Sequence, residues 1–180
     1  MLNKRPIGIF DSGVGGLSVV KKVLELLPRA KITYLGDTAR VPYGGRPAEE
    51  LVEFADQITK FLIQQDCGII IDACNSTSAV ALDYLQRKYS NPIVGVIAPG
   101  IRAALKASKT GRIGLIGTEA TIKSRAHQKL ALRIDQGIKI LPLACPKFVP
   151  LVEAGRVKGS KTEDIIRTTL EPLMLQGIDT

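Results

Sequence analysis

Short apolar runs that alternate with helical patterns constrain the fold of this chain most strongly. The runs with the length and composition of buried strands are residues 6–10, 31–36, 67–73, 92–97, 112–117 and 138–141. Between and after them, apolar side chains recur at helical spacing in residues 17–27, 51–62 and 165–173. This alternation predicts an α/β protein with mainly parallel sheets, whose binding sites lie at the carboxyl ends of the strands.

The composition narrows the class of protein. The chain has 180 residues, of which 45% are hydrophobic, so it can fill one ordinary core or two small ones. No apolar run reaches the roughly 20 residues of a membrane helix, and Asp11 interrupts the first run too early for a signal peptide. The three cysteines are too widely spaced for a disulfide framework. We therefore expect a cytoplasmic protein without a membrane partner.

The net charge of +8 raises the possibility of a nucleic-acid partner. The lysines and arginines are scattered, however, and form no dense basic tract or aromatic-interleaved motif. A solvated basic surface is the better interpretation, and we expect no nucleic-acid partner. Such a surface raises the local concentration of an anionic small substrate.

A similarity between two segments of the sequence suggests two related lobes. Residues 7–17 (IGIFDSGVGGL) and 113–122 (IGLIGTEATI) share the order strand, small residue, hydroxyl, helix, with Ser12 and Thr118 at equivalent places. We place a first α/β lobe at residues 1–97 and a second at 98–180. The same offset puts a counterpart of Cys74 near residue 180, where GIDT has the pattern of an opening strand. We therefore expect the second lobe to be incomplete at its C-terminal end.

A glycine-rich turn follows the first strand in FDSGVGG. The carboxylate of Asp11 at its mouth would repel a phosphate, and Ser18 stands where a dinucleotide fingerprint has its third glycine. An acid at the end of a strand is instead a candidate for chemistry. The polar loop 36–46 offers Tyr43 as a hydrogen-bond donor and Gly44 for close backbone approach, with an ordinary connecting loop as the alternative.

Cys74 stands at a junction between a strand and a helix in GIIIDACNSTSA. The N–H groups and dipole of a helix N-terminus favour a thiolate, so we expect a lowered thiol pKa. Asn75 and Ser76 follow and can hydrogen-bond a carboxylate or an amine. A buried, inert cysteine is the alternative, and it is the interpretation we favour for Cys67 and Cys145.

The only histidine, His127, lies in a helical pattern, and we expect it to face solvent. A single histidine excludes both a Ser-His-Asp triad within this chain and a multi-histidine metal site, so we expect no metal. Glu153, in the segment after Cys145, is either a supporting acid or a solvated side chain.

Six stretches in order resemble the cofactor-independent amino-acid racemases, and glutamate racemases among them. They are GIFDSGVGGLSV, GDTARVPYG, DACNSTSA, GVIAPG, GLIGTEATIKS and ACPKFVPLVEAG. The resemblance implies two pseudosymmetric α/β lobes, each with a mainly parallel sheet flanked by helices, and an active site between them. It also implies glutamate as the substrate, no cofactor and a supply of D-glutamate for peptidoglycan. The oligomeric state does not follow from the sequence, which allows a homodimer.

The resemblance further implies residue roles. Cys74 removes the α-proton as a thiolate while a second cysteine delivers a proton to the opposite face, and Asp11 is the nearby catalytic acid. Glu153 serves the second cysteine. The substrate-binding positions are Ser12, Tyr43, Gly44, Asn75, Ser76 and Thr118.

Two departures from the family pattern are conservative: Ser76 replaces a usual threonine, and His127 stands where tyrosine is common. The family's second cysteine motif, Gly-Cys-Thr-His, is expected just beyond Thr180. We therefore expect the 180-residue chain to lack the second catalytic cysteine, to be inactive and to be poorly stable, with unpaired sheet edges. The alternatives are a racemase of aspartate or another acidic amino acid, and a module that binds such a substrate without exchange of its α-proton.

Overall fold

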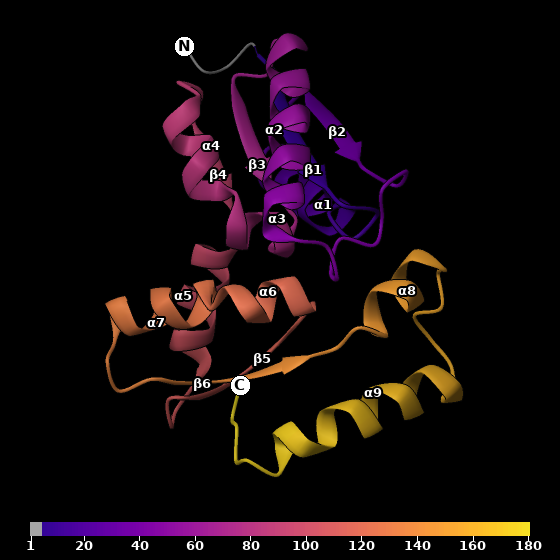
Figure 1. Cartoon of the computed structure of the whole chain (residues 1–180), viewed down its shortest axis with the longest axis vertical. Helices are drawn as coiled ribbons and strands as arrows, with labels where there is room; N and C mark the ends of the chain where they lie inside the picture. The colour runs from indigo at the N-terminus through magenta and orange to yellow at the C-terminus, as the bar shows by residue number, and fades with distance from the viewer. Residues whose placement is uncertain (1–4) are drawn as a thin grey trace. The chain divides into compact units, whose positions relative to one another are not determined.

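The computed structural model describes residues 5–180, and the contacts within the chain divide it into two compact units, between Val96 and Ile97. The first unit contains β1 (Ile7–Asp11), α1 (Leu17–Leu26), β2 (Ile32–Gly36), α2 (Ala48–Gln64), β3 (Ile69–Asp72), α3 (Asn75–Val80), α4 (Leu82–Lys88) and β4 (Ile93–Gly95) (Figure 1). The second contains α5 (Ile97–Ala107), β5 (Arg112–Gly117), α6 (Glu119–Ser124), α7 (Ala126–Ile134), β6 (Lys139–Ala144), α8 (Phe148–Glu153) and α9 (Ser160–Met174).

The first unit is built on a parallel sheet of strand order β2-β1-β3-β4. The helix α2 lies against it (Figure 1) and buries a stripe of apolar side chains at helical spacing, including Leu51, Ile58 and Leu62. Ile58 and Leu62 belong to the same core cluster as Phe10 and Ile70 from the two central strands. The core therefore fixes β1 and β3, whose carboxyl ends carry the candidate site.

The second unit has a two-stranded parallel sheet, with β5 in register beside β6 from Arg112 opposite Lys139 to Gly117 opposite Ala144. The last residues run along β5 in the same direction. The backbone N–H of Asp179 donates to the Arg112 carbonyl at 3.0 Å, and that of Gly114 donates to the Thr180 carbonyl at 2.7 Å.

The predicted fold class is confirmed, because parallel sheets flanked by helices form in both units. The predicted strand at residues 92–97 is too long. It ends at Gly95, and α5 begins at Ile97 and runs through Pro99 and Gly100. Pro99 is compatible with this helix because it falls in the first turn, where backbone N–H groups have no helical acceptor.

The prediction that His127 faces solvent is wrong. Its side chain is buried, and its Nδ1 has no hydrogen-bond partner among residues 5–180. His127 and Ala131, one helical turn apart, form the buried face of α7, the helix that contacts α5. Burial lowers the pKa of the imidazole, which favours its neutral form.

Candidate active site

The carboxyl ends of β1 and β3 bring two acids and a thiol to one edge of the sheet. The two strands are neighbours with Phe10 opposite Asp72, so Asp11 ends one strand and Cys74 follows the other by two residues. Both side chains are buried, with Asp11 7% exposed and Cys74 4% exposed. The structure thus brings together the two residues predicted to be catalytic, and it adds Asp72 to them.

The backbone of the glycine-rich turn orients Asp11. Its Oδ2 accepts hydrogen bonds from the N–H of Gly13 at 3.2 Å and of Gly16 at 3.0 Å. Gly16 precedes the first residue of α1, so the carboxylate lies where the helix dipole favours negative charge. A Cβ at Gly16 would lie only 2.6 Å from the Asp11 Cβ, which explains the glycine. The turn therefore holds the acid in place.

Cys74 caps the start of α3, as the sequence pattern indicated, but its thiol is not activated. Burial, followed by the charges of Asp72 and Asp11, raises the pKa of the thiol to about 11. The prediction of a lowered pKa is therefore wrong. The helix α3 has only six residues, and its N-terminus does not outweigh desolvation and two nearby carboxylates. The thiol rests protonated at neutral pH.

Sequence reasoning missed Asp72. This residue is completely buried, and its Oδ1 accepts hydrogen bonds from the Thr77 hydroxyl at 2.6 Å and from the Cys74 N–H at 3.1 Å. Its Oδ2 has no hydrogen-bond partner in the described part of the chain. Burial raises the pKa of this carboxyl group to about 7. The signal in the sequence is a carboxylate inside the apolar run GIIIDAC.

The Tyr43 hydroxyl, which was predicted to contact the substrate, is hydrogen-bonded within the loop after β2. Tyr43 is buried, and its hydroxyl donates to the Asp37 carboxylate, which also pairs with Arg40 Nε at 2.6 Å. The Arg40 guanidinium lies over the ring of Phe54, 4.1 Å from its centroid. Burial and the bond to Asp37 raise the pKa of Tyr43 far above its ordinary value. The hydroxyl proton of Tyr43 is therefore already used in the hydrogen bond to Asp37. Gly44 follows Tyr43 in the same turn.

The remaining predicted residues divide between the two units. In the first, Ser12 follows Asp11 and is partly buried, Asn75 is exposed, and Ser76 is buried in the first turn of α3. In the second, Thr118 caps α6 by accepting a hydrogen bond from the Thr121 N–H at 3.3 Å, and Glu153 ends α8.

The other two cysteines are packed in their respective units. Cys67 is fully buried in the core of the first unit, as predicted. Cys145 directly follows β6 and is 3% exposed, and its Sγ donates to the Leu143 carbonyl at 3.7 Å. Burial raises the pKa of the Cys145 thiol, so it too rests protonated.

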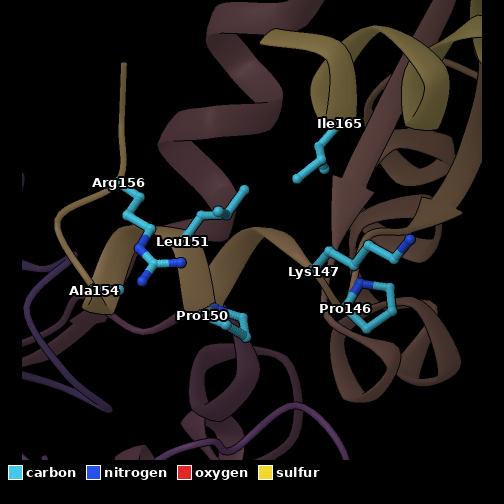
Figure 2. Close-up of a pocket in the computed structure, with 7 residues that line it drawn as sticks. All are labelled: Pro146, Lys147, Pro150, Leu151, Ala154, Arg156 and Ile165. Carbon is cyan, nitrogen blue, oxygen red and sulfur yellow. The ribbon is translucent and has the colours of Figure 1, made fainter. Parts of the chain in front are cut away.

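A pocket of about 370 Å³ lies in the second unit beside α8 (Figure 2). Its lining residues are Pro146, Lys147, Pro150, Leu151, Ala154, Arg156 and Ile165. None of the predicted site residues is among them. Within residues 5–180 no cluster of three or more His, Cys, Asp or Glu side chains could hold a metal ion, and no helix is long and apolar enough to cross a membrane.

Comparison with known proteins identifies the family. The family model described as Asp/Glu/Hydantoin racemase matches residues 7–180. The chain belongs to this racemase family. The resemblance drawn from the six stretches is therefore confirmed.

Several curated relatives in the racemase family are named glutamate racemase. Those from Carnobacterium sp. (strain St2) and Enterococcus faecalis (strain ATCC 700802 / V583) are each 45% identical to this chain. The matches cover 99% and 100% of the chain, but 67% and 66% of the relatives. The chain thus spans about two thirds of the length of these racemases.

Solved racemase structures share the fold. The glutamate racemase isoform RacE1 from Bacillus anthracis matches with a TM-score of 0.91 at 38% identity, over 95% of this chain and 64% of that one. The glutamate racemase from Francisella tularensis subsp. tularensis SCHU S4, solved in complex with D-glutamate, matches with a TM-score of 0.90 at 37% identity, over 99% and 66%.

Proposed function

We propose that this protein interconverts L- and D-glutamate without a cofactor, and that Cys74 exchanges the α-proton on one face of the substrate. The observation that carries the proposal is the convergence of Asp11 and Cys74 at the ends of adjacent strands. The family and the curated relatives named glutamate racemase support it. In this proposal the protein supplies D-glutamate for peptidoglycan in the cytoplasm. A homodimer is compatible with this function.

Inversion at an α-carbon requires one acid–base group on each face, and the two groups exchange roles in the reverse direction. Cys74 rests as a thiol, which is the form that donates a proton. To act as the base it must first ionise beside two carboxylates. The ammonium group of a bound amino acid offsets their charge, and this lowers the free energy of the thiolate.

Asp11 is the group that we assign to the substrate ammonium. Two backbone N–H groups already orient its carboxylate, and its charge acts on the Cys74 thiol, so it can accept a proton from the ammonium or tune the thiol. We assign binding of the substrate to Ser12, Asn75 and Ser76, with the peptide groups around Tyr43 and Gly44 lining the site.

The group on the opposite face is assigned through the family. We propose a second cysteine there, served by Glu153, with Thr118 as a substrate contact from the second unit. Cys145 is not our candidate, because its Sγ is directed at a carbonyl of its own strand.

The substrate class is tested by measuring L-glutamate and L-aspartate side by side. With the protein at its full natural length, we expect the circular dichroism of L-glutamate to decay to zero as the racemate forms. L-aspartate is one methylene shorter, and we expect its rate of racemisation to be about one tenth of that of L-glutamate or lower.

Faster turnover of aspartate would overturn the assignment of glutamate and favour the alternative acidic amino-acid racemase. Saturable binding of glutamate in calorimetry, with no change in its circular dichroism, would instead establish a binding module.

A further inference from the structure

Asp72 is a buried acid that has no role in the racemase mechanism proposed above. It is the last residue of β3, and its side chain is inaccessible to solvent. A buried carboxylate is costly unless its oxygens accept hydrogen bonds. Only Oδ1 does so here, and Oδ2 has no partner among residues 5–180. One oxygen of the group is therefore unsatisfied while the group is ionised.

The hydrogen bonds of the Asp72 side chain lead to the start of the helix that follows the thiol. Its Oδ1 accepts from the backbone N–H of Cys74 and from the hydroxyl of Thr77, which lies in the first turn of α3. The Ser78 hydroxyl donates to the Asp72 carbonyl at 3.0 Å and accepts from the Val96 N–H at 3.4 Å. The end of β3 thus fixes the direction in which α3 starts.

The surroundings of Asp72 contain few other charges. Asp11 of the adjacent β1 is a carboxylate whose charge disfavours ionisation of Asp72, and Cys74 is the titratable group that directly precedes α3. The strand β4 on the other side carries no titratable side chain, and Tyr43 interacts with Cys74 from the loop after β2. No basic residue is among the main causes that shift the pKa of Asp72 or of Cys74.

We propose that Asp72 is a positioning residue for Cys74: its hydrogen bonds hold the thiol at the start of α3, and the charge of its carboxyl group sets how readily the thiol ionises. Because burial raises the pKa of this carboxyl group to about 7, the negative charge beside the thiol varies with pH. Ionised Asp72 makes loss of the thiol proton harder, and protonated Asp72 makes it easier. This inference rests on the proposed role of Cys74 as the acid–base group.

The test is an NMR titration of the free protein labelled with ¹³C at the cysteine Cβ and aspartate Cγ positions. The Asp72 signal is assigned by its loss in Asp72→Asn, and the Cys74 signal by its loss in Cys74→Ser. We expect the Asp72 carboxyl carbon to titrate near pH 7, since burial raises its pKa to about 7. Titration at the ordinary aspartate value of about 4 would overturn the proposal.

The Asp72→Asn variant supplies the second readout. Asparagine keeps an oxygen for the Cys74 and Thr77 donors and replaces the unpartnered Oδ2 with an amide group. We expect the titration midpoint of the Cys74 Cβ to fall by about one pH unit, because a nearby negative charge is lost. A purely structural role for Asp72 would leave the midpoint unchanged, and that result would refute the proposal.

Asp83→Asn is the matched control, since it removes the same charge from an exposed position in α4 and should not move the Cys74 midpoint. If Asp72→Asn does not fold, the carboxyl titration of the parent protein decides the proposal, with the assignment taken from through-bond correlations. Neither readout requires turnover, so failure of this inference and failure of the racemase proposal are distinguishable.

Discussion

Replacing Cys74 with serine is expected to lower the turnover number for glutamate racemisation by about 10²–10⁴-fold, the usual contribution of a positioned acid–base group. Serine keeps the size of the side chain and the backbone N–H that donates to Asp72. Its hydroxyl group is a far weaker acid than a thiol. Steady-state kinetics by circular dichroism measure the effect, and KM should change little because binding is assigned to other groups.

Cys67→Ala is the control for this substitution. Cys67 is also a buried cysteine next to β3, but it lies in the core at the opposite end of the strand from Cys74. Its replacement should leave the turnover number within a fewfold of the parent value. A Cys74→Ser protein that racemises glutamate as fast as Cys67→Ala would show that the thiol has no part in the chemistry.

Gly36→Ala is expected to give the largest loss of stability among conservative changes near the site. A Cβ at Gly36 would lie 2.4 Å from the Gly13 carbonyl oxygen, which also accepts a hydrogen bond from the Tyr34 hydroxyl at 2.7 Å. Backbone atoms cannot rotate away, so the turn must move. We expect the free energy of unfolding in urea to fall by about 1–3 kcal/mol, the usual cost of overpacking.

The same displacement should reduce activity, because the Gly13 N–H orients Asp11. Gly45→Ala is the matched control: Gly45 lies in an exposed turn, and a Cβ there meets no atom within 4 Å. Its effect on unfolding should stay within about 0.5 kcal/mol. Equal stability of the two variants would mean that the close approach of Gly36 to the turn is absent in solution.

Local sequence patterns predicted the fold because they coincide with its physical causes. Two of the apolar runs form β1 and β3, and their side chains help to fill the core of the first unit. Parallel pairing then places the ends of neighbouring strands at one edge, which is why Asp11 and Cys74 could be selected from sequence. The sequence pattern extended the fourth strand to residue 97 and assigned no helix after it. The helix α5 begins at Ile97 and contains Pro99 in its first turn, where a helix tolerates proline.

The electrostatics of the site could not be predicted in the same way. The pKa of Cys74 depends on how deeply the thiol is buried and on how close two carboxylates approach, and neither follows from its place before a helix. Asp72 lies in a predicted strand, and only its burial and its register beside β1 reveal its contact with the site. The bond between Tyr43 and Asp37 likewise depends on the path of a loop.

We assign exchange of the α-proton of glutamate to Cys74, and this claim can be tested by hydrogen exchange in heavy water. The full-length protein is incubated with L-glutamate in D₂O while the α-proton signal is followed by NMR. We predict that the signal disappears as D-glutamate forms, and that Cys74→Ala abolishes both changes. Persistence of the α-proton while glutamate is bound would contradict the claim and leave a protein that binds its ligand without turnover.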